Sequence, residues 1–465
     1  MRSIHARLTE GSVSRHLFDL TLPMIWGLLA IMAFNATDTW FVAQLGTREL
    51  AAMSFTFPVV MVLISLGIGL MAGTSSVLAR VIGQRDHDRI RRITTDALVL
   101  SALLSLLVTL TGLLTFEPLF RLLGASPELV PLIGDYMTTW YAGYVFLLVP
   151  MVGMGAIRAT GDSRFQSRLL IAAAVINLIL DPLLIFGWLG FPRLEIQGAA
   201  IATVVARAMT LVAGFYFLQF KMPMITYTWP RWPEVWRSWK DVLHVGLPAT
   251  GTNIIIPLST GVIVALVAGF GSDAVAGFGV AVRIEGIALV IFYAMSAVIG
   301  PFVGQNLGAG KSERIREAMK LSALFCMGLG ACIAIALAFG AEWLTRLFNE
   351  EPAVVGVSTS YLYLVPLSYG TAGLIMVVNA AFNGLGRPLP AVVISLTRMG
   401  ALYIPLAYVG ARLFGVTGIF VAATLSNLLV GAAAFAWNWR ICRQQGTAEP
   451  DLREPRAPGS DVSGA

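Results

Sequence analysis

The stretch AAMSFTFPVVMVLISLGIGLMAGTSSVLA, residues 51–79, runs for 29 residues without one charged side chain. An α-helix rises 1.5 Å per residue, so about 20 apolar residues are enough to cross the hydrocarbon core of a bilayer. A strand of an outer-membrane barrel needs only about 10, and apolar runs of this length therefore exclude a barrel. The stretch predicts a membrane-spanning helix.

The composition of the whole chain fits this prediction. Hydrophobic residues make up 57% of the 465 residues, and charged residues only 12%. Soluble domains carry about 25% charged residues, and a soluble protein could not cover so much apolar surface with so few charges. The net charge of +6 lies in short connections between apolar runs, which indicates a basic membrane side rather than a nucleic-acid partner. We therefore expect an all-α polytopic protein surrounded by membrane lipids.

The apolar runs predict twelve transmembrane helices, with ends good to a few residues. Of the 32 Lys and Arg residues, 24 fall in the two termini and the even-numbered connections, five in the odd-numbered connections and three inside spans. Positive side chains accumulate on the cytoplasmic side, so both termini are expected there. The expected spans are 17–45, 51–79, 93–118, 130–157, 165–188, 197–220, 244–270, 275–303, 317–341, 355–383, 389–413 and 417–440.

The chain also repeats itself at an offset of about 225 residues. Leu22-Pro23 matches Leu247-Pro248, Gly46 matches Gly271, and Gly83-Gln84 matches Gly304-Gln305 after a small deletion. Six spans precede the second copy, so both copies keep the same membrane orientation, and a pseudo-two-fold axis along the membrane normal is expected. This predicts a six-helix lobe at 1–220, a linker at 221–243, a second six-helix lobe at 244–440 and a disordered cytoplasmic tail at 441–465.

The linker between the lobes is rich in tryptophan. Trp232, Trp236 and Trp239 are spaced i, i+4, i+7 and share one helical face, with Trp229 preceding them. The spacing predicts a short helix lying in the cytoplasmic membrane interface; the alternative is a Trp-rich linker of no special shape.

Four polar side chains of the first lobe fall at one depth in the outer half of the membrane. Asp38 and Asp181 each lie about seven residues before the predicted outer end of their span, about 10 Å deep. Asn177 lies one turn before Asp181, and Thr203 six residues into the sixth span. Ionisable groups inside a membrane are costly and therefore indicate function. The alternatives are a capped structural acid at Asp38 and interhelical hydrogen bonding at Asn177 and Asp181.

The chemistry of this layer favours a coupling ion. Two carboxylates in a medium of low dielectric constant cannot both stay charged unless a cation joins them, so the pair is a candidate proton site. With the amide oxygen of Asn177 and the hydroxyl of Thr203, the same group of ligands would also suit Na⁺. Pro182 removes a backbone donor beside Asp181 and is expected to bend the helix. Arg283 and Glu285 in span eight are two residues apart and therefore point to different sides of the helix. Three roles remain open for them: pairing with residues of other spans, packing, or a part in coupling. The sequence shows no metal spacing, no cofactor motif and no ATP site.

Taken together, these features resemble the multidrug and toxic-compound extrusion (MATE) transporters over residues 12–440. The resemblance rests on the two six-span repeats and on short motifs. The acids in spans one and five are similar to those of the DinF-like branch, where Asp38, Asn177, Asp181 and Thr203 would carry coupling. Phe34 stands where that branch often has a Tyr, which disfavours Na⁺ and favours H⁺. The motif residues are Asp38, Val42, Gly46, Ala51 and Ala52, with the segments at 83–84, 158–162, 281–285, 304–310 and 383–387.

The resemblance implies a monomeric antiporter of the bacterial inner membrane rather than an enzyme. It would export lipophilic or cationic compounds in exchange for H⁺ or Na⁺ by alternating access of the two lobes. The alternative within the same superfamily is a flippase for lipid-linked sugars, although such proteins usually need a cationic cavity. A membrane-embedded enzyme is a remoter alternative, because its aspartate motifs are missing.

Overall fold

The computed structural model describes residues 5–444, and within this range every regular element is a helix. The predicted tail at 441–465 therefore lies almost wholly outside the described residues. The α-helices are α1 (Val13–Ala43), α2 (Thr47–Gln84), α3 (His87–Leu122), α4 (Val130–Ala142), α5 (Val145–Ala159), α6 (Ser163–Phe186), α7 (Glu195–Tyr216), α8 (Trp232–Ala268), α9 (Ser272–Ala288), α10 (Val290–Gly308), α11 (Ser312–Arg346), α12 (Pro352–Leu364), α13 (Tyr369–Gly384), α14 (Leu389–Leu396) and α15 (Ile404–Gln444).

The prediction of twelve spans is confirmed. Among the described residues, ten helical stretches are long and apolar enough to cross a membrane, and the bent pair of α4 and α5 adds an eleventh. The stretch Leu389–Arg443 makes two passes, because Gly415 leaves the helical region of backbone space with φ 62° and ψ −146°. Gly410 and Gly418 pack backbone to backbone on either side of this turn, where a Cβ on Gly410 would lie 2.4 Å from the Gly418 carbonyl oxygen.

Three of the expected spans are interrupted where the sequence predicted continuous helices. Span four bends by 43° between α4 and α5, near Gly143, and span ten breaks between α12 and α13, near Ser368. These two breaks are separated by the same offset as the sequence repeat. Span eight breaks at Leu289, between α9 and α10, and this break has no equivalent in the continuous helix α2.

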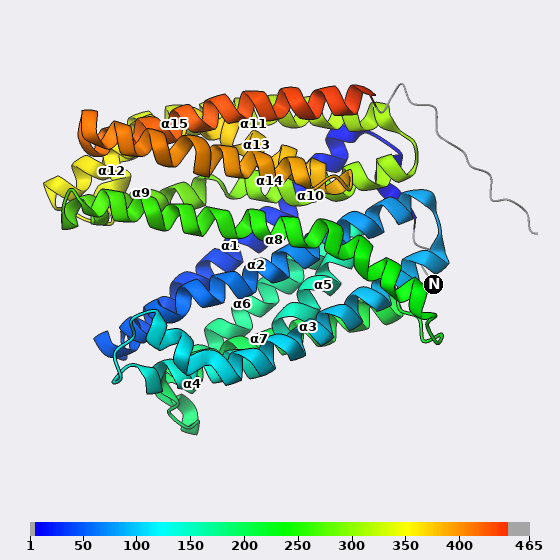
Figure 1. The fold of residues 1–465 in the computed structure, drawn as a ribbon, viewed down its shortest axis with the longest axis horizontal. Helices are drawn as coiled ribbons and strands as arrows, with labels where there is room; N and C mark the ends of the chain where they lie inside the picture. Colours follow the sequence, from blue (N-terminus) through cyan, green and yellow to red (C-terminus); the bar gives the residue numbers. More distant parts are fainter. Residues whose placement is uncertain (1–4, 445–465) are drawn as a thin grey trace, which may run out of the picture.

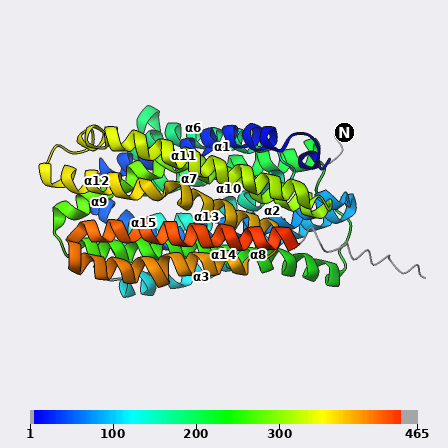
Figure 2. The same cartoon turned by 90° about the horizontal axis from the view of Figure 1, so that it is seen from above.

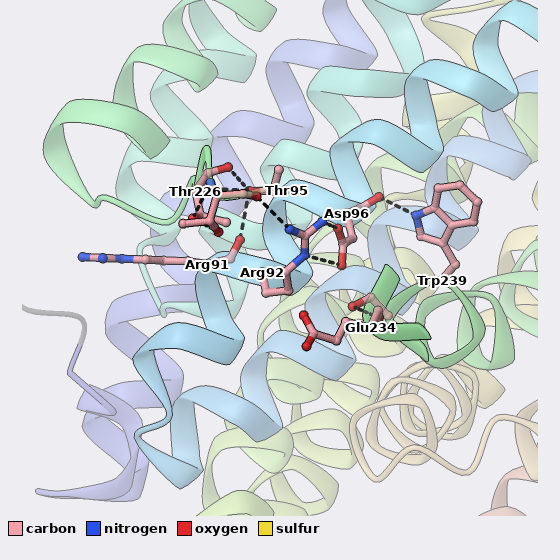
Figure 3. A network of polar contacts seen from close by, with 9 residues as sticks. Arg91, Arg92, Thr95, Asp96, Thr226, Glu234 and Trp239 are labelled. Atoms are coloured by element: carbon pink, nitrogen blue, oxygen red, sulfur yellow. Dashed lines mark hydrogen bonds and ion pairs between the residues drawn. The ribbon is translucent and has the colours of Figure 1, made fainter. Parts of the chain in front are cut away.

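The Trp-rich helix expected in the linker is present but is not a separate element. It forms the first turns of α8, which runs without interruption from Trp232 into span seven. The preceding residues are fixed to α3, as Figure 3 shows: the Thr226 amide donates to Thr95 Oγ1 over 3.0 Å, and Arg92 donates to the Thr228 carbonyl over 3.3 Å. Trp239 Nε1 donates to the Asp96 carbonyl over 2.9 Å, so α8 begins against the first lobe.

The helices form two lobes that converge toward one end of the molecule and diverge toward the other (Figure 1). We call the convergent end, which carries residues 6–11 and the connections rich in arginine, the basic end. In the perpendicular view (Figure 2), α11, α13 and α15 of the second lobe lie in front of the helices of the first lobe. The lobes are therefore stacked as two layers, joined most closely at the basic end.

Glycines allow the lobes to meet backbone to backbone at the basic end. A Cβ on Gly83 of α2 would lie 2.2 Å from the Gln305 carbonyl oxygen of α10, and one on Gly308 would lie 2.0 Å from the Arg80 carbonyl oxygen. Gly83 and Gly304 are equivalent positions of the sequence repeat, so α2 and α10 cross at their matching turns. This is the arrangement that a pseudo-two-fold axis between the two helices requires.

The first helix of each lobe begins in the apolar core of the other lobe. The basic half of α1 contributes Val13, Leu17 and Met24 to a buried cluster whose other members, apart from Leu8, are second-lobe side chains. The basic half of α8 contributes Val242, the equivalent of Leu17, to the first-lobe cluster. Farther along, Val42 of α1 packs with first-lobe side chains, and Val267 of α8 packs with second-lobe side chains. The two helices therefore cross between the layers.

Residues 6–11 lie across the junction of the two lobes at the basic end. The Leu8 amide donates to Gln305 Oε1 over 3.1 Å, and Gln305 Nε2 donates to the Ala159 carbonyl of α5 over 2.6 Å. Asn306 Nδ2 donates to the Leu8 carbonyl over 3.1 Å, and Arg314 donates to the Gly11 carbonyl over 2.6 Å. One fully buried glutamine thus connects the N-terminal segment, the first lobe and the second lobe.

Replacing this glutamine should weaken the junction. Gln305→Leu would leave the Leu8 amide and the Ala159 carbonyl without their partners, and buried polar groups of this kind cost about 1–3 kcal/mol each. We expect the variant to melt at a lower temperature than the wild type in detergent, as measured by differential scanning fluorimetry. Gln84→Leu is the matched control, because Gln84 holds the equivalent repeat position but is exposed. An equal effect of both substitutions would contradict this account of Gln305.

Candidate functional site

The structure buries all four polar residues that the sequence singled out in the first lobe. Asp38 lies in α1, Asn177 and Asp181 lie in α6, and Thr203 lies in α7. Their exposed fractions are 8%, 1%, 0% and 8% in that order. Asp38 and Asp181 each lie five residues before the last residue of their helix, so the two carboxyls occupy similar depths from the end opposite the basic end.

Side-chain contacts bring these residues into one region. Asn177 Nδ2 donates to Thr203 Oγ1 over 3.4 Å, which links α6 to α7. Asp38 and Asp181 interact electrostatically, which links α1 to α6. Around them, Phe41 and Val42 of α1 pack with Ile185 of α6 and Ala199 of α7 in a small apolar cluster. The shared depth read from the sequence therefore corresponds to proximity in space.

The buried oxygens of this site lack hydrogen-bond donors. Among residues 5–444, no group forms a hydrogen bond of acceptable geometry with Asp38 Oδ1, Asn177 Oδ1 or either carboxylate oxygen of Asp181, although the Asn177 side chain lies close enough to interact with the Asp181 carboxylate. Buried polar atoms are nearly always hydrogen-bonded, and an unpaired charge in an apolar surrounding is far costlier than a neutral group. A proton on a carboxyl, or a cation between the carboxylates, would supply what these oxygens lack.

A small cavity lies beside Asn177 and Thr203. It offers about 10 Å³ to a water-sized sphere, which is about the room that one water molecule needs. Phe34 of α1 and Arg207 of α7 contribute to its wall. The cavity has room for a water molecule or a small ion but not for an organic compound.

Sequence reasoning missed two residues of this site, both on α4. Tyr136 is 5% exposed and interacts electrostatically with both Asp38 and Asp181. Trp140, one turn farther along, is 7% exposed, and its side chain interacts with Tyr136. The signal was available, because Tyr136 lies six residues into span four, at a depth similar to that of the acids, with Trp140 at i+4.

The remaining predicted residues lie in three different surroundings. Pro182 follows Asp181 inside α6, which continues as an α-helix to Phe186. Glu285 accepts a hydrogen bond from the Tyr361 hydroxyl over 2.5 Å, inside the second lobe. Arg283 is exposed and points away from Glu285. The structure therefore does not bring Arg283 and Glu285 to the acids of the first lobe.

The second lobe has no equivalent of the acidic layer. At the repeat offset, Asp38 corresponds to Ile263, and Asn177 and Asp181 correspond to Leu402 and Leu406. Ile263 is 1% exposed and belongs to the second-lobe core. A six-helix lobe of this kind therefore packs with apolar residues at these positions, which argues against a purely structural need for the acids.

Comparison with known proteins gives a consistent result. The family model described as MatE matches residues 23–183 and 248–409, one segment in each lobe. A protein of Shewanella oneidensis named "FAD transporter" is 40% identical over 435 residues, covering 94% of this chain and 96% of the relative. The "Probable multidrug resistance protein YpnP" of Bacillus subtilis is 26% identical, covering 92% of this chain and 95% of the relative.

Solved structures of similar shape support the same relationship. The Vibrio cholerae MATE transporter VcmN in the bent form superposes with a TM-score of 0.88 at 30% identity, covering 93% of this chain and 98% of that chain. A structure described as the outward-facing conformation of a multidrug resistance MATE family transporter superposes with a TM-score of 0.89 at 26% identity, covering 95% and 99%.

The position of Tyr136 leads to a prediction. If the Tyr136 hydroxyl forms a hydrogen bond with one of these carboxyls in a state of the transport cycle that binds a proton, Tyr136→Phe should slow proton-coupled transport about fivefold or more, because one hydrogen bond contributes about 1 kcal/mol. The measurement is the initial rate of substrate-driven proton release from everted membrane vesicles. Tyr141→Phe on the same helix serves as the control, because the Tyr141 ring packs against Gly112 of α3. Equal rates for the Tyr136 variant and the wild type would exclude this role.

Proposed function

Because the chain belongs to the MatE family of membrane transporters, we propose that it is a secondary antiporter that exports organic compounds in exchange for protons. Asp38 and Asp181 are the coupling groups, and Asn177 and Thr203 complete their surroundings. The observation that carries this proposal is the set of buried carboxylate oxygens without hydrogen-bond donors in the described chain. Such a site changes its charge when a proton binds, and a transporter can use that change to favour one conformation.

Protons are favoured over sodium as the coupling ion. A sodium site needs several oxygen ligands around one position, and Phe34 places an aromatic ring without a hydroxyl beside the small cavity at Asn177. The cavity has room for about one water molecule, which suits proton delivery. Protonation would neutralise the layer in the first lobe, and Pro182 gives α6 a weak point beside Asp181 at which its shape could change.

The arrangement of the lobes supports an alternating-access cycle. The lobes converge at the basic end and diverge at the other (Figure 1), and the similar structure with a TM-score of 0.89 is described as outward-facing. We place the protein in the bacterial inner membrane with both termini in the cytoplasm, since the basic end carries most of the Lys and Arg residues. In this conformation the cytoplasmic side is closed by the glycine contacts of α2 with α10. Membership of the DinF-like branch stays a prediction.

The relatives favour two kinds of substrate. Multidrug resistance proteins are similar over almost the whole chain, which fits the lipophilic or cationic compounds expected from the sequence. A second candidate is flavin adenine dinucleotide, favoured by the 40% identity with a protein named as an FAD transporter. Both candidates can use the same coupling site, because the small cavity beside Asn177 and Thr203 has room for an ion rather than for the transported compound.

The coupling role of Asp181 can be tested directly. Everted vesicles that contain the protein are acidified inside without Na⁺, ethidium or FAD is added outside, and the pH gradient is followed with a fluorescent dye. We expect the substrate to collapse the gradient with wild type, and Asp181→Asn to reduce the rate at least tenfold, because the amide cannot carry the proton. Asp135→Asn is the control, since Asp135 is an exposed acid on the neighbouring helix α4.

Each outcome of this experiment has a distinct meaning. Full activity of Asp181→Asn would refute coupling through this carboxyl. A response that appears only after Na⁺ is supplied would make the acidic layer a sodium site. No response to either compound with either ion would favour the flippase alternative.

A further inference from the structure

Arg283 is an exposed arginine without a partner on a helix inside the membrane-spanning region. It lies in α9, where Gly277, Ala281 and Ile284 form the buried side, and Gly277 packs against Val357 of α12. Arg283 lies on the opposite side, and its side chain has no hydrogen bond or ion pair with any residue between 5 and 444. Its charge is therefore available to another molecule.

The exposed side of α9 faces the first lobe. Gly286 lies on it, and a Cβ on Gly286 would meet the Met32 methyl carbon of α1 at 3.4 Å. Gly279, one turn before Arg283, is open, with nothing in the described structure within 4 Å of its Cβ position. Figure 1 shows α8 and α9 along the edge of the second lobe nearest the first lobe. Arg283 therefore lies at the boundary between the lobes, where they diverge.

The depth of Arg283 requires a polar surrounding. It lies eleven residues after Ser272, the first residue of α9, about 16 Å along the helix axis and so near the middle of the span. An unpaired arginine at this depth does not face lipid, because a charged side chain in hydrocarbon costs several kcal/mol; such residues face water-filled paths. The space beside Arg283 is therefore accessible to solutes.

The nearest acid on α9 does not neutralise this charge. Glu285 accepts its hydrogen bond from Tyr361 inside the second lobe and also interacts electrostatically with Arg398. The acids of the coupling site belong to α1 and α6 of the first lobe and are at most 8% exposed. The boundary between α1 and α9 therefore presents one free positive charge.

We infer that Arg283 binds a phosphate group of the exported compound at the boundary between α1 and α9, so that the substrate class is phosphate-bearing aromatic compounds. The inference rests on the proposed transport function and names its substrate class. Guanidinium donates two parallel hydrogen bonds to phosphate oxygens, which gives orientation as well as affinity. The relative named as an FAD transporter is 40% identical, and FAD carries two phosphates next to flat aromatic rings.

Binding can be measured separately from transport. The full chain is purified into lipid nanodiscs, and FAD and riboflavin are titrated by the change in flavin fluorescence. Both share the same flavin ring, but only FAD carries the diphosphate. We expect the wild type to bind FAD at least tenfold more tightly than riboflavin, and Arg283→Gln to remove this difference while riboflavin binding is unchanged. Arg283→Lys keeps the positive charge but cannot donate two parallel hydrogen bonds to a phosphate, so it should retain part of the preference for FAD over riboflavin.

Two further variants complete the experiment. Arg346→Gln removes an exposed arginine that pairs with Glu342, and it should leave FAD binding unchanged. Asp181→Asn should keep the preference for FAD over riboflavin, because a shift between conformations changes the binding of both flavins alike, so failure of coupling and failure of phosphate recognition give different results. The inference is overturned if Arg283→Gln binds FAD as the wild type does, or if the wild type shows no preference for FAD over riboflavin.

Discussion

The close contact between the backbones of α2 and α10 is the constraint on which the arrangement of the lobes depends. Gly83 and Gly308 have no side chains, so two helices from opposite halves of the sequence approach until backbone atoms touch, and any Cβ would overlap a carbonyl oxygen. Close approach of this kind replaces the hydrophobic effect as the source of helix association in a membrane. Because the contact lies at the basic end, the lobes are held there and are free to diverge at the other end.

The exchange of α1 and α8 between the cores adds a mechanical consequence. Each helix starts in one lobe and ends in the other, and each has a proline near the crossing, Pro23 in α1 and Pro248 in α8. If the basic end opens, the first turns of α1 must do one of two things. They leave the second-lobe core, or they move with that core while the remainder of α1 stays packed against α6. α1 also carries Asp38, so a change of charge at the acidic layer acts on a helix that connects both lobes.

The two lobes use their buried polar groups in different ways. In the first lobe the carboxylate oxygens of Asp181 find no donor in the described chain, which leaves them dependent on a proton or an ion. In the second lobe Glu285 is satisfied by Tyr361 and belongs to the packing of α9 against α12. The helical fold is repeated in the two lobes, but the acidic site of the first lobe has no counterpart in the second. The free charge of Arg283 at the boundary then gives the second lobe a different task, recognition of the substrate.

The sequence by itself determined the class of fold, the number of spans, the repeat and the depth of the acids, because membrane insertion depends on hydrophobic length and a helix converts residue number directly into depth. It did not reveal the broken spans at Gly143, Leu289 and Ser368, nor that the helix begun at Trp232 continues as α8. It also did not reveal Tyr136, although its depth was readable. Which residues at one depth face each other depends on the rotation of neighbouring helices, and that rotation is set by packing between segments far apart in the chain. For the same reason only the tertiary structure decided that Glu285 is satisfied inside its lobe while Arg283 stays free at the boundary.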